Sequence, residues 1–323
     1  MMRIRPYRPE DAEQWDAFCA AAVNATFLHS RRFLSYHGDR FKDRSCILER
    51  NNEWLAIMPA AEHPAQTDAV MSHPGISYGG LLHAGRLAGQ DMLDAFSIVT
   101  QHYRDLGYRD FYYKLIPHIY PLSPAQDDVY ALFRFKAKLY RCDLSTAIDL
   151  DARLKPAERR RRALRKAHQS GLILDEDIKH LAGFWPILAE NLAQKHQVHP
   201  VHTLAEIQDL SNRFPDNIKL VCALNDGKIV AGTLLFITPR VFHAQYNASN
   251  HIGHESNALD AVFQYCIEMG QGRGRYFDFG VSSENEGWIL NDGLCRFKTE
   301  FGGTGVAHEF YHLPLHTGAP GSQ

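Results

Sequence analysis

The hydrophobic pattern alternates between strand-like and helix-like segments along most of the chain. Two apolar runs, residues 218–224 and 229–236, flank the turn-forming stretch 225–228 and predict a β-hairpin. The elements predicted after this hairpin are a strand, a helix and a strand, at residues 241–248, 257–269 and 275–279. The order hairpin, strand, helix, strand also occurs between residues 46 and 115. The repeated order predicts an α/β protein with two similar halves.

The seam between the two predicted halves lies near residues 150–156. We assign residues 1–150 to an N-terminal half and residues 151–315 to a C-terminal half that carries the functional site. The last residues, 316–323, contain Gly and Pro and are predicted to form a disordered tail.

Composition and charge narrow the class of protein. The 323 residues include 35 basic and 37 acidic side chains, which gives no general attraction to nucleic acid or to a membrane surface. The six cysteines are spaced singly, without the pairs typical of zinc sites, and fit a reducing compartment. The N-terminus lacks the apolar core of a signal peptide, and no apolar run is long enough to span a bilayer. We therefore expect a soluble, cytoplasmic protein.

A basic segment opens the second half. Residues 156–170 have helical character, and Gly171 ends them. Arg161 and Arg165 would share one helix face, from which arginines can hold a diphosphate bidentately. The alternative interpretation is a solvated, charged helix face.

A short helix is predicted near the C-terminus. Leu294, Phe297 and Phe301 would lie on one face, and Gly302 would end the helix in a left-handed conformation. Lys298 lies beside this face in the last turn. It either compensates the helix dipole at the surface or has a functional role.

These two segments resemble known motifs. Phe297-Lys298, Phe301-Gly302 and the preceding strand residues Tyr276 and 278–280 resemble the C-terminal signature of the Fem-type peptidoglycan aminoacyltransferases, relatives within the GNAT superfamily. The run 161–167 with Gly171 resembles the basic helix of the same family. This resemblance implies two tandem GNAT-like domains, each with a mixed central sheet flanked by helices.

The resemblance also implies where the chemistry takes place. In GNAT proteins the acyl donor lies between two central strands, and residues 242–249 occupy the place of one of them. We therefore expect Tyr246 among the reacting groups, and Asn247 and Ser249 beside the donor; the alternative is that they only pack in the sheet. Asp278 is a candidate general base or a structural cap, and Lys298 a candidate for stabilising developing charge.

The donor-binding loop of ordinary GNAT proteins is poorly matched. In residues 250–257 only Gly253 fits the phosphate-binding pattern, and Asn257 is a further donor-side candidate that could equally cap the next helix. Phe297 stands where ordinary GNAT proteins place a tyrosine that protonates the leaving thiolate, and is predicted to contact substrate. His199 is expected in a loop that lines the acceptor, and we predict no metal site.

The predicted function is acyl transfer, with acyl-CoA as a co-substrate and no permanently bound cofactor. The predicted acceptor is an amine of a nucleotide-linked amino sugar or cell-envelope glycan precursor. One alternative is a Fem-like transferase that uses aminoacyl-tRNA, which the balanced charge disfavours. Another is a catalytically silent binding module. The sequence indicates no oligomeric state.

Overall fold

The structure is a computed structural model that describes residues 1–196 and 199–315; the tail predicted at 316–323 lies outside the described residues. The chain folds into two compact units. Unit 1 contains Met1–Asp143, Asn285–Trp288 and the chain from Ala307 onward, and unit 2 contains Leu144–Glu284 and Ile289–Val306. The chain therefore returns to unit 1 at its end, whereas the sequence-based division has a single cut after residue 150.

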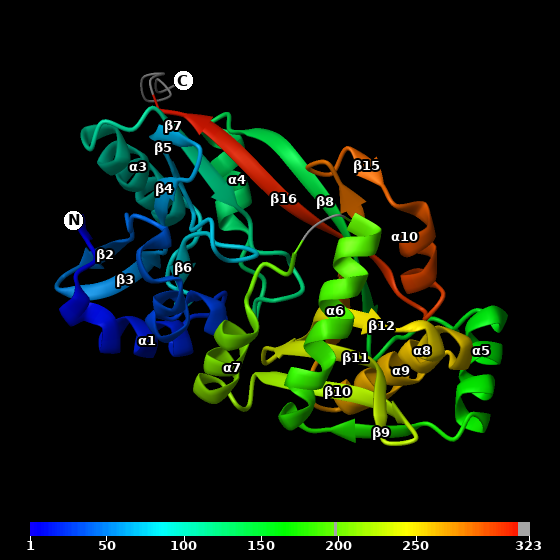
Figure 1. The fold of residues 1–323 in the computed structure, drawn as a ribbon. Helices are drawn as coiled ribbons and strands as arrows, with labels where there is room; N and C mark the ends of the chain where they lie inside the picture. Colours follow the sequence, from blue (N-terminus) through cyan, green and yellow to red (C-terminus); the bar gives the residue numbers. More distant parts are fainter. Residues whose placement is uncertain (197–198, 316–323) are drawn as a thin grey trace. The chain divides into compact units, whose positions relative to one another are not determined.

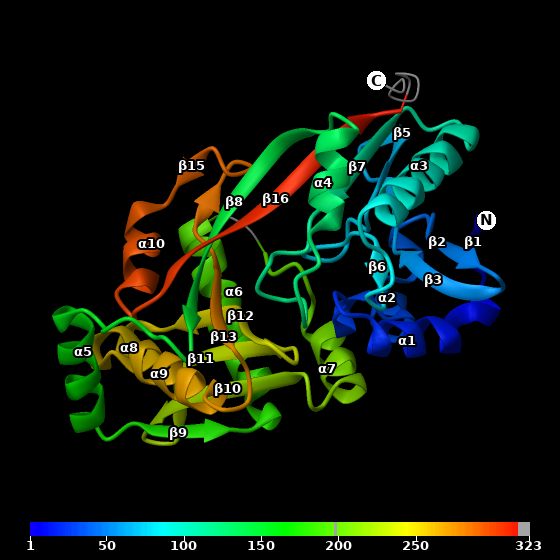
Figure 2. The same cartoon turned by 180° about the vertical axis from the view of Figure 1, so that it is seen from behind.

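Unit 2 has a mixed sheet with the strand order β8-β13-β12-β11-β10-β9. Its strands are β8 (Lys138–Asp149, shared with unit 1), β9 (Ile173–Glu176), β10 (Ile218–Asn225), β11 (Lys228–Ile237), β12 (Val241–Ser249) and β13 (Tyr276–Val281). Its helices are α5 (Glu158–Gln169), α6 (Leu181–His196), α7 (Leu204–Arg213), α8 (His251–Ser256), α9 (Ala258–Gly270) and α10 (Asp292–Thr299), with a short hairpin of β14 (Ser283–Glu284) and β15 (Ile289–Leu290) before α10. Helices α6 and α9 pack against opposite faces of β11 and β12 (Figures 1 and 2).

Unit 1 has two groups of strands. One is a four-stranded sheet of order β1-β2-β3-β6, and the other has the order β4-β5-β7-β16. The strands are β1 (Met2–Pro6), β2 (Cys46–Arg50), β3 (Glu53–Met58), β4 (Ala61–His63), β5 (Gln66–Met71), β6 (Leu82–His83), β7 (Asp110–Lys114) and β16 (Thr304–Pro314). The helices are α1 (Ala12–Ala21), α2 (Arg31–Leu34), α3 (Gln90–Asp105) and α4 (Asp127–Arg134). The apolar face of α3 packs into a core with residues from both groups of strands.

The two units share a strand–helix–strand crossover. In unit 1, β5 and β7 are parallel and α3 lies between them in sequence; in unit 2, β12 and β13 are parallel and α9 lies between them. The predicted α/β fold with two GNAT-like halves is confirmed. The hairpins differ, because β2–β3 belongs to the separate four-stranded sheet whereas β10–β11 continues the sheet of β12.

Among the described residues, no helix has the length and apolar character needed to cross a bilayer. Those residues also contain no group of three or more His, Cys, Asp or Glu side chains placed to hold a metal ion.

A buried lysine makes the stability of unit 1 depend on pH. Lys114 Nζ donates to the carbonyls of His73 (3.1 Å) and Ile76, and no carboxylate among the described residues pairs with it. Burial lowers the pKa of Lys114 from 10.5 to about 7. Between these two values the unfolded chain holds a proton that the folded chain has lost. The free energy of unfolding therefore rises with pH across this window, by at most about 1.4 kcal/mol per pH unit.

We expect urea denaturation to show this rise between about pH 7 and 9 in the wild-type protein, and a smaller rise in Lys114→Met. Other groups that titrate in this range are common to both proteins, so the difference between the two isolates Lys114. Equal rises would show that Lys114 keeps its proton in the folded protein.

Candidate active site

The two central strands of unit 2 pair over only a short distance. Strands β12 and β13 are parallel from Val241 opposite Tyr276 to His243 opposite Asp278, and no further pair joins them in the described part of the chain. Just beyond His243, a register shift against β11 leaves Gln245 as a β-bulge. The backbone groups of β12 past His243 therefore have no partner on β13, as expected where an extended ligand adds to a strand edge.

His243 and Asp278 form a hydrogen-bonded pair at this point. His243 Nδ1 lies 2.9 Å from Asp278 Oδ2, and Asp278 is fully buried. Because Phe277 and Phe279 pack in the core against α9, Asp278 points to the opposite face of the sheet, together with His243.

Other groups hold the Asp278 carboxylate in place. Ser145 Oγ donates to Asp278 Oδ1 at 2.5 Å, and the backbone N–H of Gly280 donates to the same oxygen at 3.0 Å. The His243 side chain is 18% exposed, and its only hydrogen bond within the described residues is the one to Asp278. With Nδ1–H donated to the carboxylate, Nε2 is available as a proton acceptor.

Lys298 lies on the neighbouring helix α10 and is 5% exposed, so it is not a surface lysine. Its Nζ donates to the carbonyls of Gly280 (2.9 Å) and Val281 (2.6 Å), the residues where β13 ends. Burial lowers the pKa of Lys298 to about 8, and the negative charge of Asp278 partly opposes this shift. Lys298 therefore fixes the end of β13 and places a positive charge near the His243–Asp278 pair.

Replacing Lys298 with methionine should reduce both stability and turnover. The two carbonyls would lose their donor, at a cost of about 1–3 kcal/mol, and the loss of one fixed charge should reduce turnover roughly 10- to 1000-fold. Arg296→Met is the matched control, because Arg296 is on the same helix and mostly exposed. Wild-type turnover in Lys298→Met would show that the lysine only supports the fold.

The predicted site residues of β12 point in different directions. The Tyr246 hydroxyl is hydrogen-bonded to His202, 2.7 Å from Nδ1, and the ring packs edge-on against Trp185. Burial raises the pKa of Tyr246, so its hydroxyl keeps its proton at neutral pH and is not poised to accept one. Asn247 lies opposite Thr233 on β11, and Asn247 Oδ1 is buried without a hydrogen-bond partner in the described residues. Asn247 thus keeps an unused acceptor beside the strand edge.

The predicted donor-side residues after β12, Gly253 and Asn257, determine the backbone conformation there. A Cβ on Gly253 would lie 2.3 Å from the carbonyl oxygen of Val230 and 2.4 Å from Ser249 Oγ, so only glycine lets α8 approach the sheet here. Asn257 adopts a left-handed conformation (φ 54°) between α8 and α9, and its side chain makes no capping hydrogen bond. A short helix therefore occupies the place of the predicted phosphate loop.

The arginines of the basic helix α5 differ in burial and in their ion-pair partners. Arg160 is buried, pairs with Asp260 and Glu300, and lies 4.4 Å above the ring of Phe297. Arg161 and Arg165, the two predicted ligand-binding residues, are more exposed and both pair with Glu158. Phe297 packs against Phe263 of α9. Its visible role is therefore packing.

Of the other predicted residues, His199 is exposed in the segment before α7. The structure brings Asp278 and Lys298 together, and adds two residues that the sequence did not single out, His243 and Ser145. The sequence does contain a signal for His243. His243 is the third residue of β12, Asp278 is the third residue of β13, and the two strands are parallel.

One family model matches the part of the chain that contains these residues. The family described as "Acetyltransferase (GNAT) domain" matches residues 152–298, which include His243, Asp278 and Lys298. No curated protein sequence gives a significant match.

Solved structures show the same fold over nearly the whole chain. FemX has 10% sequence identity and a TM-score of 0.68, with 97% of each chain covered. L-PGS from Bacillus licheniformis has 14% identity and a TM-score of 0.61, over 94% of this chain and 91% of that one. A tandem GNAT protein from the clavulanic acid biosynthesis pathway has 10% identity and a TM-score of 0.52, over 100% of both chains. Residues 152–298 therefore form a GNAT acetyltransferase domain, and the whole chain has the fold seen in FemX and in a tandem GNAT protein.

Proposed function

We propose that this protein transfers an acyl group from acyl-CoA to an amine, with His243 as the general base. The observation that carries this proposal is the hydrogen-bonded pair of His243 and Asp278 at the last parallel pair of β12 and β13. An imidazole whose Nδ1–H is held by a buried carboxylate presents Nε2 in a fixed position to an incoming nucleophile.

The proposed reaction uses the free ring nitrogen of His243 as the proton acceptor. The acceptor amine attacks the carbonyl carbon of the thioester and forms the new C–N bond, while His243 Nε2 takes the proton that the amine loses. The C–S bond then breaks, and the thiolate of CoA leaves and takes up a proton. Unpaired N–H groups on the β12 edge can polarise the thioester carbonyl.

The charges of unit 2 favour a small donor over RNA. Glu158 partly neutralises the exposed arginines of α5, and the charge of Arg160 is paired with Asp260 and Glu300. Helix α5 therefore keeps less unpaired positive charge than its sequence suggests. This disfavours RNA as a ligand, because RNA binding depends on many contacts to phosphates. Helix α5 packs beside α9, so its exposed side chains could still hold the phosphates of CoA.

The acceptor class rests on the family resemblance. We propose the amine of a nucleotide-linked amino sugar or of a cell-envelope glycan precursor, in keeping with the Fem-type motif at Phe297-Lys298. On this proposal the acyl donor and the acceptor are small molecules, and the reaction takes place in the cytoplasm.

Acetyl-CoA is expected to raise the melting temperature of the protein, because a ligand that binds only the folded state stabilises it. An amine panel with CoA release as the readout then identifies the acceptor. Bulk tRNA should give only a weak shift that disappears as salt rises from about 50 to 200 mM.

The second candidate is aminoacyl transfer from tRNA. It is favoured by the fold shared with FemX and L-PGS and by the exposed arginines of α5. Salt-resistant binding of aminoacyl-tRNA, with no response to any acyl-CoA, would replace the first proposal with this one.

A further inference from the structure

Unit 1 contains a parallel strand pair like the one at the candidate active site of unit 2. Strands β5 and β7 are joined by three parallel pairs, the last of which is Met71 opposite Tyr112, just as β12 and β13 are joined by three. In both units a helix, α3 or α9, lies between the two strands in sequence. The two units differ in what lies beyond the third pair.

The strand edge that could receive an extended ligand is missing in unit 1. In unit 2, β12 continues past its last parallel pair, from Ala244 to Ser249. In unit 1, β5 ends at Met71, the residue of its last pair. An extended ligand binds to a strand through backbone groups that have no partner. Within the described residues, unit 1 therefore has no counterpart of the free β12 edge.

The chain itself fills the gap beyond the last pair of β5 and β7. Ser72 follows β5, and its N–H donates to the carbonyl of Tyr112 at 2.9 Å, while Ser72 Oγ accepts the N–H of Lys114 at 2.7 Å. The chain then turns back, and the N–H of Gly79 donates to the carbonyl of Lys114 at 3.2 Å. Both backbone groups of Lys114, at the end of β7, are thus bonded to this returning chain.

Gly79 fits closely between the two strand ends. A Cβ on Gly79 would lie 2.5 Å from the carbonyl oxygen of Ser72 and 2.8 Å from Ser72 Oγ, so only glycine fits without a shift of the backbone. Lys114 Nζ holds the same loop through the carbonyls of His73 and Ile76. Residues 73–80 therefore close the gap between β5 and β7, and we call this segment the plug.

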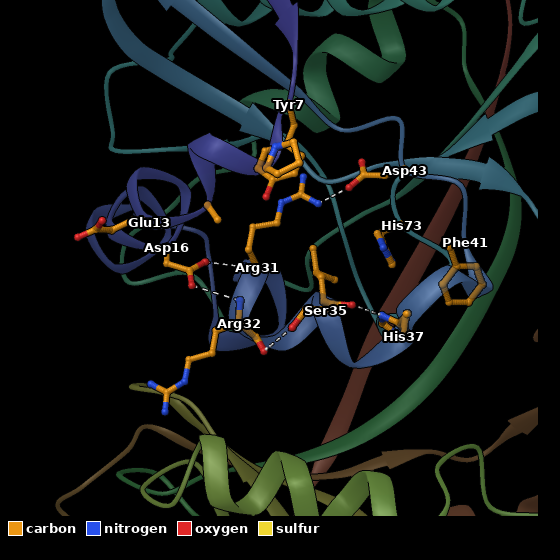
Figure 3. Close-up of a pocket in the computed structure, with 14 residues that line it drawn as sticks. Tyr7, Glu13, Asp16, Arg31, Arg32, Ser35, His37, Phe41, Asp43 and His73 are labelled. Atoms are coloured by element: carbon orange, nitrogen blue, oxygen red, sulfur yellow. Dashed lines mark hydrogen bonds and ion pairs between the residues drawn. The ribbon is translucent and has the colours of Figure 1, made fainter.

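The plug is also held by the 3-10 segment Ser35–Arg40 and the residue after it. His37 Nε2 lies 3.0 Å from the carbonyl oxygen of Gly75, and a Cβ on Gly75 would lie 2.6 Å from Phe41 Cε2. His37, Phe41 and His73 line one cavity (Figure 3). The plug is therefore fixed by contacts to β7 and to this segment.

The N-terminus of α3 carries a carboxylate of the protein itself. The N–H of Gly89 donates to Asp127 Oδ1 at 2.8 Å, and Asp91 lies in the first turn, paired with Arg50. A helix N-terminus attracts phosphates through its unpaired N–H groups and the positive end of its dipole. Asp127 already uses this position, so a diphosphate there would meet a like charge.

We infer that unit 1 is a closed, self-occupied counterpart of the unit 2 site, and that each chain binds one acyl donor, in unit 2. The plug lies where a donor would pass between the strands, and Asp127 lies where its phosphates would bind. The number of donors rests on the proposed acyl transfer, whereas the closed state of unit 1 does not.

Amide hydrogen exchange followed by NMR, on the full chain without ligand, tests the closed state. We expect the amides of Ser72, Gly79 and Lys114 to exchange about 100-fold or more slowly than in an unstructured peptide. Gly79→Ala should speed their exchange at least about tenfold, because the added Cβ displaces the plug. Ser77→Ala, at an exposed position of the plug, should not. Fast exchange of Gly79 in the wild-type protein, or wild-type rates in folded Gly79→Ala, would overturn the closed state.

Calorimetric titration with CoA tests the number of donor sites. We expect one CoA per chain, and in the presence of CoA a slower exchange in residues 244–249 with no change in residues 72–93. Two CoA molecules per chain, or protection by CoA in residues 72–93, would contradict the inference. No binding of CoA to either unit would instead count against the proposed donor, and the ligand-free exchange would still decide whether unit 1 is closed.

Discussion

Replacing His243 with glutamine is expected to lower kcat/KM for acyl transfer by about 10²- to 10⁴-fold, the usual contribution of a general base. Glutamine keeps a polar side chain of similar reach but cannot accept a proton at neutral pH. The fold should persist, because the His243 side chain is partly exposed and makes a single hydrogen bond in the described residues. The measurement is steady-state kinetics with acetyl-CoA and the amine found in the acceptor screen.

A matched control is available within the same unit. His180 also pairs with a carboxylate, 2.8 Å from Asp175, and lies outside the site. His180→Gln should leave kcat/KM unchanged. Asp278→Asn should also lower kcat/KM. The double variant with His243→Gln should lose less than the two single losses combined, because the two residues act as one unit. Wild-type kinetics in His243→Gln would remove His243 from the mechanism.

Replacing Arg160 with methionine is expected to destabilise the protein by about 3–5 kcal/mol, the typical cost of leaving buried charges unpaired. The Arg160 side chain is 5% exposed, and Asp260 and Glu300 are its partners. Burial raises the pKa of Asp260 although Arg160 opposes this, so the carboxylate has a high desolvation cost even when paired. The guanidinium also stacks on Phe297 and Phe301, and that contact would be lost.

Urea or thermal unfolding measures this effect, with Arg165→Met as the control on the same helix. Arg165 is mostly exposed and should show little change in the unfolding midpoint. The double variant with Asp260→Asn should recover part of the loss, because it removes one of the unpaired charges. An unfolding midpoint in Arg160→Met equal to that of Arg165→Met would show that the ion pair contributes nothing net.

Local patterns predicted much of unit 2. The hairpin of β10 and β11 follows from its turn residues, which Asp226 (φ 49°) and Gly227 (φ 74°) confirm. Helix α10 ends before Gly302, which has a φ of 95°. A Cβ added to this glycine would lie 2.1 Å from the carbonyl oxygen of Leu154. These features depend on neighbouring residues, so they can be predicted from the sequence. The hairpin of β4 and β5 and the separate sheet of β1, β2, β3 and β6 depend on long-range pairing and were not predicted.

The sequence by itself determined the α/β class, the two GNAT-like halves and two of the residues near the site, Asp278 and Lys298, because each belongs to a recognisable local motif. Only the tertiary structure decided the partner of Asp278. His243 is 35 residues away in sequence, and parallel pairing of β12 with β13 brings the two side chains to 2.9 Å. The structure likewise decided that Arg160, rather than Arg161 or Arg165, is buried. The reason is that burial and strand register are set by contacts between distant segments, which a helical or alternating pattern does not specify.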